Sequence, residues 1–231
     1  MRSSPPAGEK ITYKIGSEQF EGYFASSSGK SKGLVVVIHD WDGLTGYEEK
    51  RVSMLSKAGY DAFAVDLYGK GNRPVERKMK KAETGKLYEN RERMRKLILG
   101  GMAEARKKFN KSAVVMGYCF GGAATLELSR SGMAKNVKGY ATFHGGLKTP
   151  KGQKYSKSAP IFISHGGADA GIPMDDVSQI SKELEAAGIE YDIEVYSGAP
   201  HAFTVFGSDR YRKKADEKSW QSFLRFLDDN L

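Results

Sequence analysis

The feature that most constrains this chain is an abrupt change from strand to helix around residues 117–122, which read GYCFGG. The preceding residues 112–116, SAVVM, form an apolar run short enough for a buried strand, and residues 123–128, AATLEL, favour a helix. So sharp a turn needs Gly117 and Gly121, because residues without a Cβ let strand and helix pass closely. The pattern is that of a nucleophile elbow, with Cys119 at the apex in place of the usual serine.

Cys119 is the only cysteine among the 231 residues. A free cysteine is often no more than a small buried hydrophobic residue, so the elbow pattern alone leaves two interpretations open. A single cysteine excludes an internal disulfide, and the N-terminus lacks the apolar segment of a signal peptide. No apolar run reaches membrane-spanning length. We therefore predict a cytoplasmic protein, or a periplasmic or secreted one if a leader was removed.

Strands and helices alternate along the rest of the chain. Two alternating runs around a Gly-Ser turn predict a hairpin, and the continuously apolar run at 34–38 predicts a strand covered on both faces. The length suits one domain, 1–231, with residues 1–10 flexible. We expect an α/β fold with a mostly parallel sheet and helices on both faces. The expected strands are 11–15, 19–24, 34–38, 60–65, 112–116, 137–143, 160–164 and 191–196, and the expected helices include 47–58, 86–109, 175–187 and 215–229.

Two later loops carry residues that suit a cysteine nucleophile. Asp169 follows the strand at 160–164, and His201 follows the strand at 191–196. Active sites of open α/β sheets gather at the carboxyl ends of strands, and the order nucleophile, acid, histidine is that of the α/β-hydrolase arrangement. Asp175 and Asp176 compete for the role of the acid, but they suit the first turn of the next helix. The partners favour Cys119 as a nucleophile over a packing residue.

At these residues the chain resembles the dienelactone hydrolase family of the α/β-hydrolase fold. The similarity runs from about residue 11 to residue 227. It implies a triad of Cys119, His201 and Asp169, and cofactor-free hydrolysis of an enol lactone or a related small ester. The motifs that carry it are VIHDWDGL (37–44), VDLYGK (65–70), GYCFGG (117–122), HGGAD (165–169) and GAPHAF (198–203).

The chemistry can also be argued from the residues. A thiol with an ordinary pKa near 8.5 must lose its proton before it attacks a carbonyl, and His201 would take that proton while Asp169 fixes the imidazole tautomer. The backbone N–H groups of Phe120 and Trp41 would stabilise the developing oxyanion. A thiolate attacks esters better than amides, so we expect a small ester or lactone as substrate. No metal-ligand spacing and no phosphate-binding loop is present, so we expect no metal and no cofactor.

Three positions bear on the substrate. Members of the family usually carry Glu where this chain has Asp40, and the shorter side chain leaves contact with the resting thiol open. Substrate carboxylates are held by arginines in the best-known members. Here Lys70 stands at one of these positions and Val205 at the other, so the resemblance does not ensure an anionic substrate.

The remaining histidines lie at strand ends. His144 follows the strand at 137–143 and either lines the pocket or bonds to backbone. His39 and His165 also lie at strand ends, and we interpret both as structural.

The net charge of +9 is concentrated in one segment. Residues 70–111 contain 15 Lys and Arg against five Glu, while the rest of the chain is about neutral. A solvated face or lid is the simplest interpretation, and a rim that attracts anionic substrates is another. Alternative functions are polyanion binding through this segment and a non-catalytic binding module of the same fold. We expect no nucleic-acid or membrane partner, and a monomer or weak homodimer.

Overall fold

The computed structural model describes residues 8–231, and the chain divides into two units. The N-terminal unit comprises residues 1–113 with Leu231, and the C-terminal unit comprises residues 114–230. The expected single domain, 1–231, stays a prediction. Of the ten residues expected to be flexible, 1–7 lie outside the described residues, whereas Glu9 and Lys10 begin the first strand.

The sheet of the N-terminal unit has the strand order β1-β2-β4-β3. The predicted hairpin forms from β1 and β2, which are antiparallel and place Tyr13 opposite Phe20. Strand β4 is antiparallel to β2 and parallel to β3. Every residue of β3 is buried, as its apolar sequence predicts, and every residue of β4 is buried as well. The strands are β1 (Glu9–Ile15), β2 (Glu18–Ala25), β3 (Leu34–Ile38) and β4 (Asp61–Val65).

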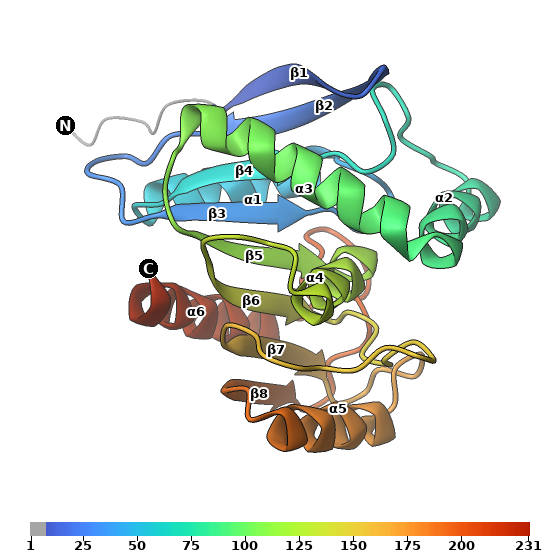
Figure 1. The fold of residues 1–231 in the computed structure, drawn as a ribbon. Coiled ribbons are helices and arrows are strands. Elements are labelled where there is room, and N and C mark those ends of the chain that lie inside the picture. The colour runs from blue at the N-terminus through green and yellow to red at the C-terminus, as the bar shows by residue number, and fades with distance from the viewer. Residues whose placement is uncertain (1–7) are drawn as a thin grey trace. The chain divides into compact units, whose positions relative to one another are not determined.

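Helices cover both faces of this sheet. Figure 1 shows α3 (Arg91–Lys108) crossing in front of β3 and β4, with α1 (Gly46–Lys57) behind them. Helix α2 (Arg77–Glu89) precedes α3, and the two are separated at Asn90. We predicted one long helix over 86–109, and that prediction is wrong at its start. The side chain of Asn90 accepts a hydrogen bond from the N–H of Arg93 at 3.0 Å, which caps α3 and begins a new helix.

The C-terminal unit repeats the alternation of strand and helix. Its strand order is β5-β6-β7-β8, and both β6–β7 and β7–β8 are parallel. Figure 1 shows α4 and α5 in front of these strands and α6 behind them. The elements are β5 (Ala113–Tyr118, of which Ala113 belongs to the other unit), α4 (Phe120–Ser131), β6 (Val137–Phe143), β7 (Ile161–Gly166), α5 (Met174–Ala187), β8 (Tyr191–Tyr196) and α6 (Lys213–Asn230).

Aromatic side chains fix α6 on this sheet. Phe223 of α6 is fully buried, and its ring meets that of Phe143 on β6 edge-to-face at 5.4 Å. Phe162 on β7 lies 5.8 Å from the ring of Phe226. Burying side chains of this size contributes roughly 2–3 kcal/mol each. This packing supports β6 at its last residue, Phe143, and β7 near its start. No helix in the described part of the chain is long and apolar enough to cross a membrane.

Candidate active site

Cys119 occupies a strained turn between β5 and α4. Its φ of 53° lies in the left-handed region, where residues other than glycine are uncommon. Its N–H donates to the carbonyl of Phe143 at 2.9 Å, and its carbonyl accepts from the N–H of Gly122 at 3.0 Å. The residue is half-buried. Backbone strain of this kind persists only where the surroundings enforce it.

Gly117 makes the turn possible. A Cβ on this residue would lie 2.1 Å from the carbonyl oxygen of Gly121, much closer than any real contact. The strand and the first turn of α4 therefore touch through their backbones, as predicted from the sequence. The result is that Cys119 stands at the end of β5 and at the N-cap of α4.

Asp169 lies in the loop after β7, and its side chain is fully buried. One carboxylate oxygen, Oδ1, accepts the N–H groups of Gly171 and Ile172, both at 2.9 Å. The other, Oδ2, lies 2.9 Å from Nδ1 of His201. Burial raises the pKa of Asp169, but the bonds from His201, Ile172 and Gly171 outweigh it, so the pKa is lowered. Asp169 is therefore a carboxylate at neutral pH.

The loops that carry Asp169 and His201 are tied together by backbone. The N–H of Ala168 donates to the carbonyl of Ala199 at 3.0 Å. Gly166 permits this approach, because a Cβ there would lie 2.3 Å from the same carbonyl oxygen. This backbone contact fixes the position of the Asp169 carboxylate relative to the His201 imidazole.

His201 lies between Asp169 and Cys119. Its Nε2 is 3.1 Å from Sγ of Cys119, and its side chain is 28% exposed. Burial, the largest effect, lowers the pKa of His201, but the bonds to Asp169 and Cys119 raise it more, to about 10. The ring can therefore take a proton from the thiol and keep it while Asp169 stays ionised.

These shifts also set the pH range over which the two groups stabilise the fold. The pKa of Asp169 is lowered, so its contribution is present above its ordinary value of 3.8 and is lost as pH falls through the folded value. The pKa of His201 is raised, so its contribution is full below 6.5 and is lost as pH rises through about 10.

The N–H of Phe120 is the first of α4, directly after Cys119. The N–H groups of a first helical turn favour negative charge, so this group suits a developing oxyanion. Trp41, the second expected donor, belongs to the N-terminal unit. Its carbonyl accepts from Tyr68 Oη at 3.0 Å, and Nζ of Lys80 lies 5.4 Å from its ring centre.

Asp40 is buried in the turn after β3. Its Oδ1 accepts the N–H of Asp42 at 2.8 Å, and its own N–H donates to Glu48 Oε1 at 3.4 Å. Burial, and then the charge of Asp40, raise the pKa of Glu48 to about 8, so Glu48 holds its proton at neutral pH. We did not single out Glu48 from the sequence, although the spacing from Thr45 is that of the capping box that the structure contains.

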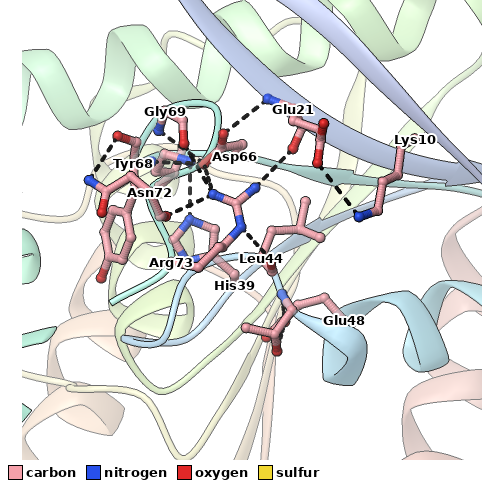
Figure 2. A network of polar contacts seen from close by, with 12 residues as sticks. Lys10, Glu21, His39, Leu44, Glu48, Asp66, Tyr68, Gly69, Asn72 and Arg73 are labelled. Carbon is pink, nitrogen blue, oxygen red and sulfur yellow. Dashed lines mark hydrogen bonds and ion pairs between the residues drawn. The ribbon is translucent and has the colours of Figure 1, made fainter. Parts of the chain in front are cut away.

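A half-buried arginine anchors the loops around Asp40 and Trp41. Arg73 donates to the carbonyl oxygens of Leu44, Gly69 and Glu21, and lies 3.4 Å from the Asp66 carboxylate (Figure 2). The loop after β3, the loop after β4 and strand β2 are therefore joined at one guanidinium. No sequence motif marks this arginine, and our sequence analysis missed it.

Lys70, in the loop after β4, is directed at the first strand. Its Nζ donates to Oγ1 of Thr12 on β1 at 2.9 Å, in an exposed position. Several other basic residues of the segment 70–111 are paired with carboxylates. The pairs are Arg73–Asp66, Lys80–Asp42, Lys86–Glu83, Arg93–Glu18, Lys107–Glu104 and Lys111–Asp61.

Two of the remaining histidines fit the structural interpretation. His39 has both ring nitrogens bonded to backbone, since Nδ1 lies 2.7 Å from the Asp40 carbonyl and Nε2 accepts the N–H of Leu67. Burial above all lowers its pKa to about 4, which keeps the ring neutral. His165 donates from Nε2 to the carbonyl of Ile172 at 2.9 Å and so closes the loop of Asp169. His144 is fully buried at the end of β6.

The two carboxylates that compete with Asp169 for the role of the acid do not hydrogen-bond to His201. Asp175 and Asp176 lie in the first turn of α5, where they favour the helix dipole, as predicted. Within residues 8–231, no group of three or more His, Cys, Asp or Glu side chains is placed to hold a metal ion.

Comparison with known structures identifies the fold. A dienelactone hydrolase-like promiscuous phosphotriesterase from metagenomic libraries matches with a TM-score of 0.87 and 22% identity, over 96% of this chain and 98% of that one. A structure of Thermogutta terrifontis esterase 2 phosphoramylated by tabun matches with a TM-score of 0.70 and 17% identity, over 98% and 96%. At such identities the likeness shows the fold alone, which is the predicted α/β-hydrolase fold.

Sequence comparison identifies the family. Protein usf of Aquifex pyrophilus is 28% identical over 97% of this chain and 99% of its own length. A candidate carboxymethylenebutenolidase of Aquifex aeolicus is 23% identical over 95% and 97%. The family model that describes dienelactone hydrolases matches residues 20–231, nearly the whole sequence. The chain therefore belongs to the dienelactone hydrolase family, a family of hydrolases.

Proposed function

We propose that this protein hydrolyses small carboxylic esters or lactones with Cys119 as nucleophile, His201 as general base and acid, and Asp169 as the residue that orients His201. The observation that carries the proposal is the hydrogen-bonded series Asp169 Oδ2, His201 Nδ1, His201 Nε2 and Cys119 Sγ, with distances of 2.9 and 3.1 Å. A nucleophile, a base within reach of it and a group that orients the base are what covalent hydrolysis requires.

The reaction would run in two halves. In the first, His201 Nε2 takes the thiol proton, and Sγ of Cys119 attacks the ester carbonyl carbon. The tetrahedral intermediate collapses, the carbon–oxygen bond to the leaving group breaks, and the imidazolium gives its proton to that oxygen. In the second, His201 takes a proton from water, the hydroxide attacks the thioester, and the carboxylic acid leaves as Cys119 recovers its proton.

The oxyanion of both tetrahedral intermediates needs preorganised donors. We propose the N–H of Phe120, at the start of α4, as one of them, and the N–H of Trp41 as the other. A donor of this kind stabilises the transition state by roughly 3–4 kcal/mol. Both are backbone groups, so their direction is set by the fold rather than by a side-chain rotamer.

Chemical modification and mass spectrometry test this function. Since Cys119 is the only thiol, iodoacetamide should add one label per chain and abolish hydrolysis of an activated aryl ester in proportion to the labelling. Rapid quenching during turnover should place the acyl mass on the peptide that contains Cys119. Unchanged turnover by the fully labelled protein would contradict the proposal. Absence of any turnover would favour the alternative of a non-catalytic binding module.

We further propose that Lys70 favours esters that carry a carboxylate beside the ester group. Lys70 is an exposed cation in the loop that follows the carboxyl end of β4. Lys70→Ala should lower kcat/KM for an anionic ester a few-fold more than for its neutral analogue, and the difference should shrink as salt rises. Lys57→Ala is the matched control, because Lys57 ends α1 just before β4 begins, at the opposite end of that strand. Equal effects on both esters at low salt would contradict the proposed role of Lys70.

The alternative of polyanion binding has less support. The carboxylate partners of the basic residues in segment 70–111 reduce the charge that this surface can offer to a polyanion. Salt-sensitive binding of a nucleic acid would nevertheless show it directly.

A further inference from the structure

His144 has an unusual backbone for its position. It follows β6 with a φ of 42°, in the left-handed region, although it is neither glycine nor asparagine. Its N–H donates to the carbonyl of Ser164 on β7 at 2.9 Å, and the residue is fully buried. A strained, buried residue at the end of a strand must be held by its surroundings, so its contacts show what the strain maintains.

Its side chain reaches the loop of His201. Nε2 of His144 lies 2.8 Å from Oγ1 of Thr204, three residues after His201. The two histidine rings meet edge-to-face, with centres 5.4 Å apart and planes at 70°. The ring of Phe203 packs against the same imidazole at 5.5 Å. His144 thus contacts His201 itself, and also the residues that fix the direction of its loop.

The loop of His201 needs such support. Ala202, directly after His201, also has a left-handed φ, of 63°. Thr204 is buried, and the loop forms a turn in which the N–H of Val205 donates to the carbonyl of Ala202 at 3.1 Å. A turn that contains a strained residue can relax unless its far side is held. Here it is held by the bond between Thr204 and His144, and by the N–H of Arg212, which donates to the carbonyl of Phe203 at 3.0 Å.

His144 also touches the strand that leads to the nucleophile. Its ring centre lies 6.0 Å from that of Tyr118, the last residue of β5 before Cys119. The same side chain therefore packs against both the strand before Cys119 and the loop after β8. A change in its position would alter the distance between the base and the nucleophile.

We propose that His144, through Thr204, is a positioning residue that keeps the His201 imidazole in line between Asp169 and Cys119. The inference rests on the proposed function, and it assigns His144 no contact with the substrate. The proposal implies that His144 and Thr204 maintain the distance of 3.1 Å between Nε2 of His201 and Sγ of Cys119. A displacement of about 1 Å at such a contact can reduce a rate by on the order of 100-fold.

Thr204→Val tests this without adding or removing bulk, because valine has the shape of threonine with a methyl group in place of the hydroxyl. We expect kcat on a neutral aryl ester to fall about tenfold while KM stays the same, since the base moves and the binding surface does not. The pH at which iodoacetamide labelling of Cys119 is half-maximal should rise, because a displaced imidazolium favours the thiolate less. Thr204→Ser keeps the hydroxyl and should restore both values.

A matched control separates positioning from stability. Ser129→Ala removes a hydrogen bond of the same length, 2.8 Å to Ser158, from the same unit. It should lower the melting temperature to a similar extent and leave the labelling profile unchanged. His144→Phe keeps an aromatic ring but not the bond to Thr204. The double variant His144→Phe/Thr204→Val should have a kcat no lower than that of Thr204→Val alone, because the two changes remove the same interaction.

Two results would overturn the proposal. One is a folded Thr204→Val protein with wild-type kcat and a wild-type labelling profile. The other is a loss of kcat without a shift of that profile, which would indicate only a structural role. If Thr204→Val does not fold, Thr204→Ala provides the same comparison. Failure of the proposed function is distinguishable, because it would show in the wild-type protein as full hydrolysis after Cys119 is labelled.

Discussion

Cys119→Ser is expected to fold like the wild type and to lose on the order of 10³-fold or more of kcat/KM on aryl esters. The side chain differs chiefly in one atom, and Gly117, which shapes the turn, remains. A serine hydroxyl is far harder to deprotonate than a thiol, and a site arranged for a thiolate does not supply a base strong enough to compensate. Cys119→Ala should lose at least as much. Steady-state kinetics and a thermal melt check both variants.

The pair of variants is informative because the two substitutions fail for different reasons. Cys119→Ala removes the nucleophile, whereas Cys119→Ser keeps an oxygen nucleophile that His201 must activate. Full esterase activity of Cys119→Ala would contradict the mechanism. Wild-type activity of Cys119→Ser would instead show that the site does not depend on the acidity of sulfur. Neither result can be attributed to another thiol, because the chain has none.

The sequence allowed the elements around the nucleophile to be predicted because they depend on local patterns. The elbow needs a glycine where strand and helix touch, and Gly117 marks that place. The apolar run at 34–38 predicted β3, which is buried throughout. The break between α2 and α3 was missed because both helices are rich in charge, so that hydrophobic periodicity gives no boundary. Only the capping side chain of Asn90 marks the second start.

The residues of the candidate site could be named from the sequence, but the contacts that hold them in place could not. Cys119, Asp169 and His201 could be named because each follows its own strand, and strand ends gather at one edge of a parallel sheet. The contact between His144 and Thr204 joins residues 60 positions apart and depends on a strained backbone at His144, which no local pattern reveals. The position of Arg73 depends in the same way on three separate segments that meet around one side chain (Figure 2).

The hydrogen bonds of Asp169 predict what happens when its charge is removed without changing its shape. In Asp169→Asn, the two N–H groups of Gly171 and Ile172 still point at the position of Oδ1, so the amide oxygen should occupy it. The amide NH₂ then takes the place of Oδ2 and faces Nδ1 of His201, which must now accept a hydrogen bond. The proton of the neutral ring is forced onto Nε2, the nitrogen that has to receive the proton of Cys119.

We therefore expect Asp169→Asn to fold normally and to lose on the order of 10⁴-fold of kcat, because its histidine is held in the wrong tautomer. Loss of the carboxylate also removes an interaction that raises the pKa of His201, so half-maximal labelling of Cys119 by iodoacetamide should move to higher pH. Asp175→Asn is the matched control, since it removes the same charge from the first turn of α5 and should leave both measurements unchanged. If Asp169→Asn kept wild-type kcat with a wild-type labelling profile, Asp169 would not orient the base. Equal losses in both variants would instead show that the net charge near α5, rather than the tautomer of His201, controls the rate.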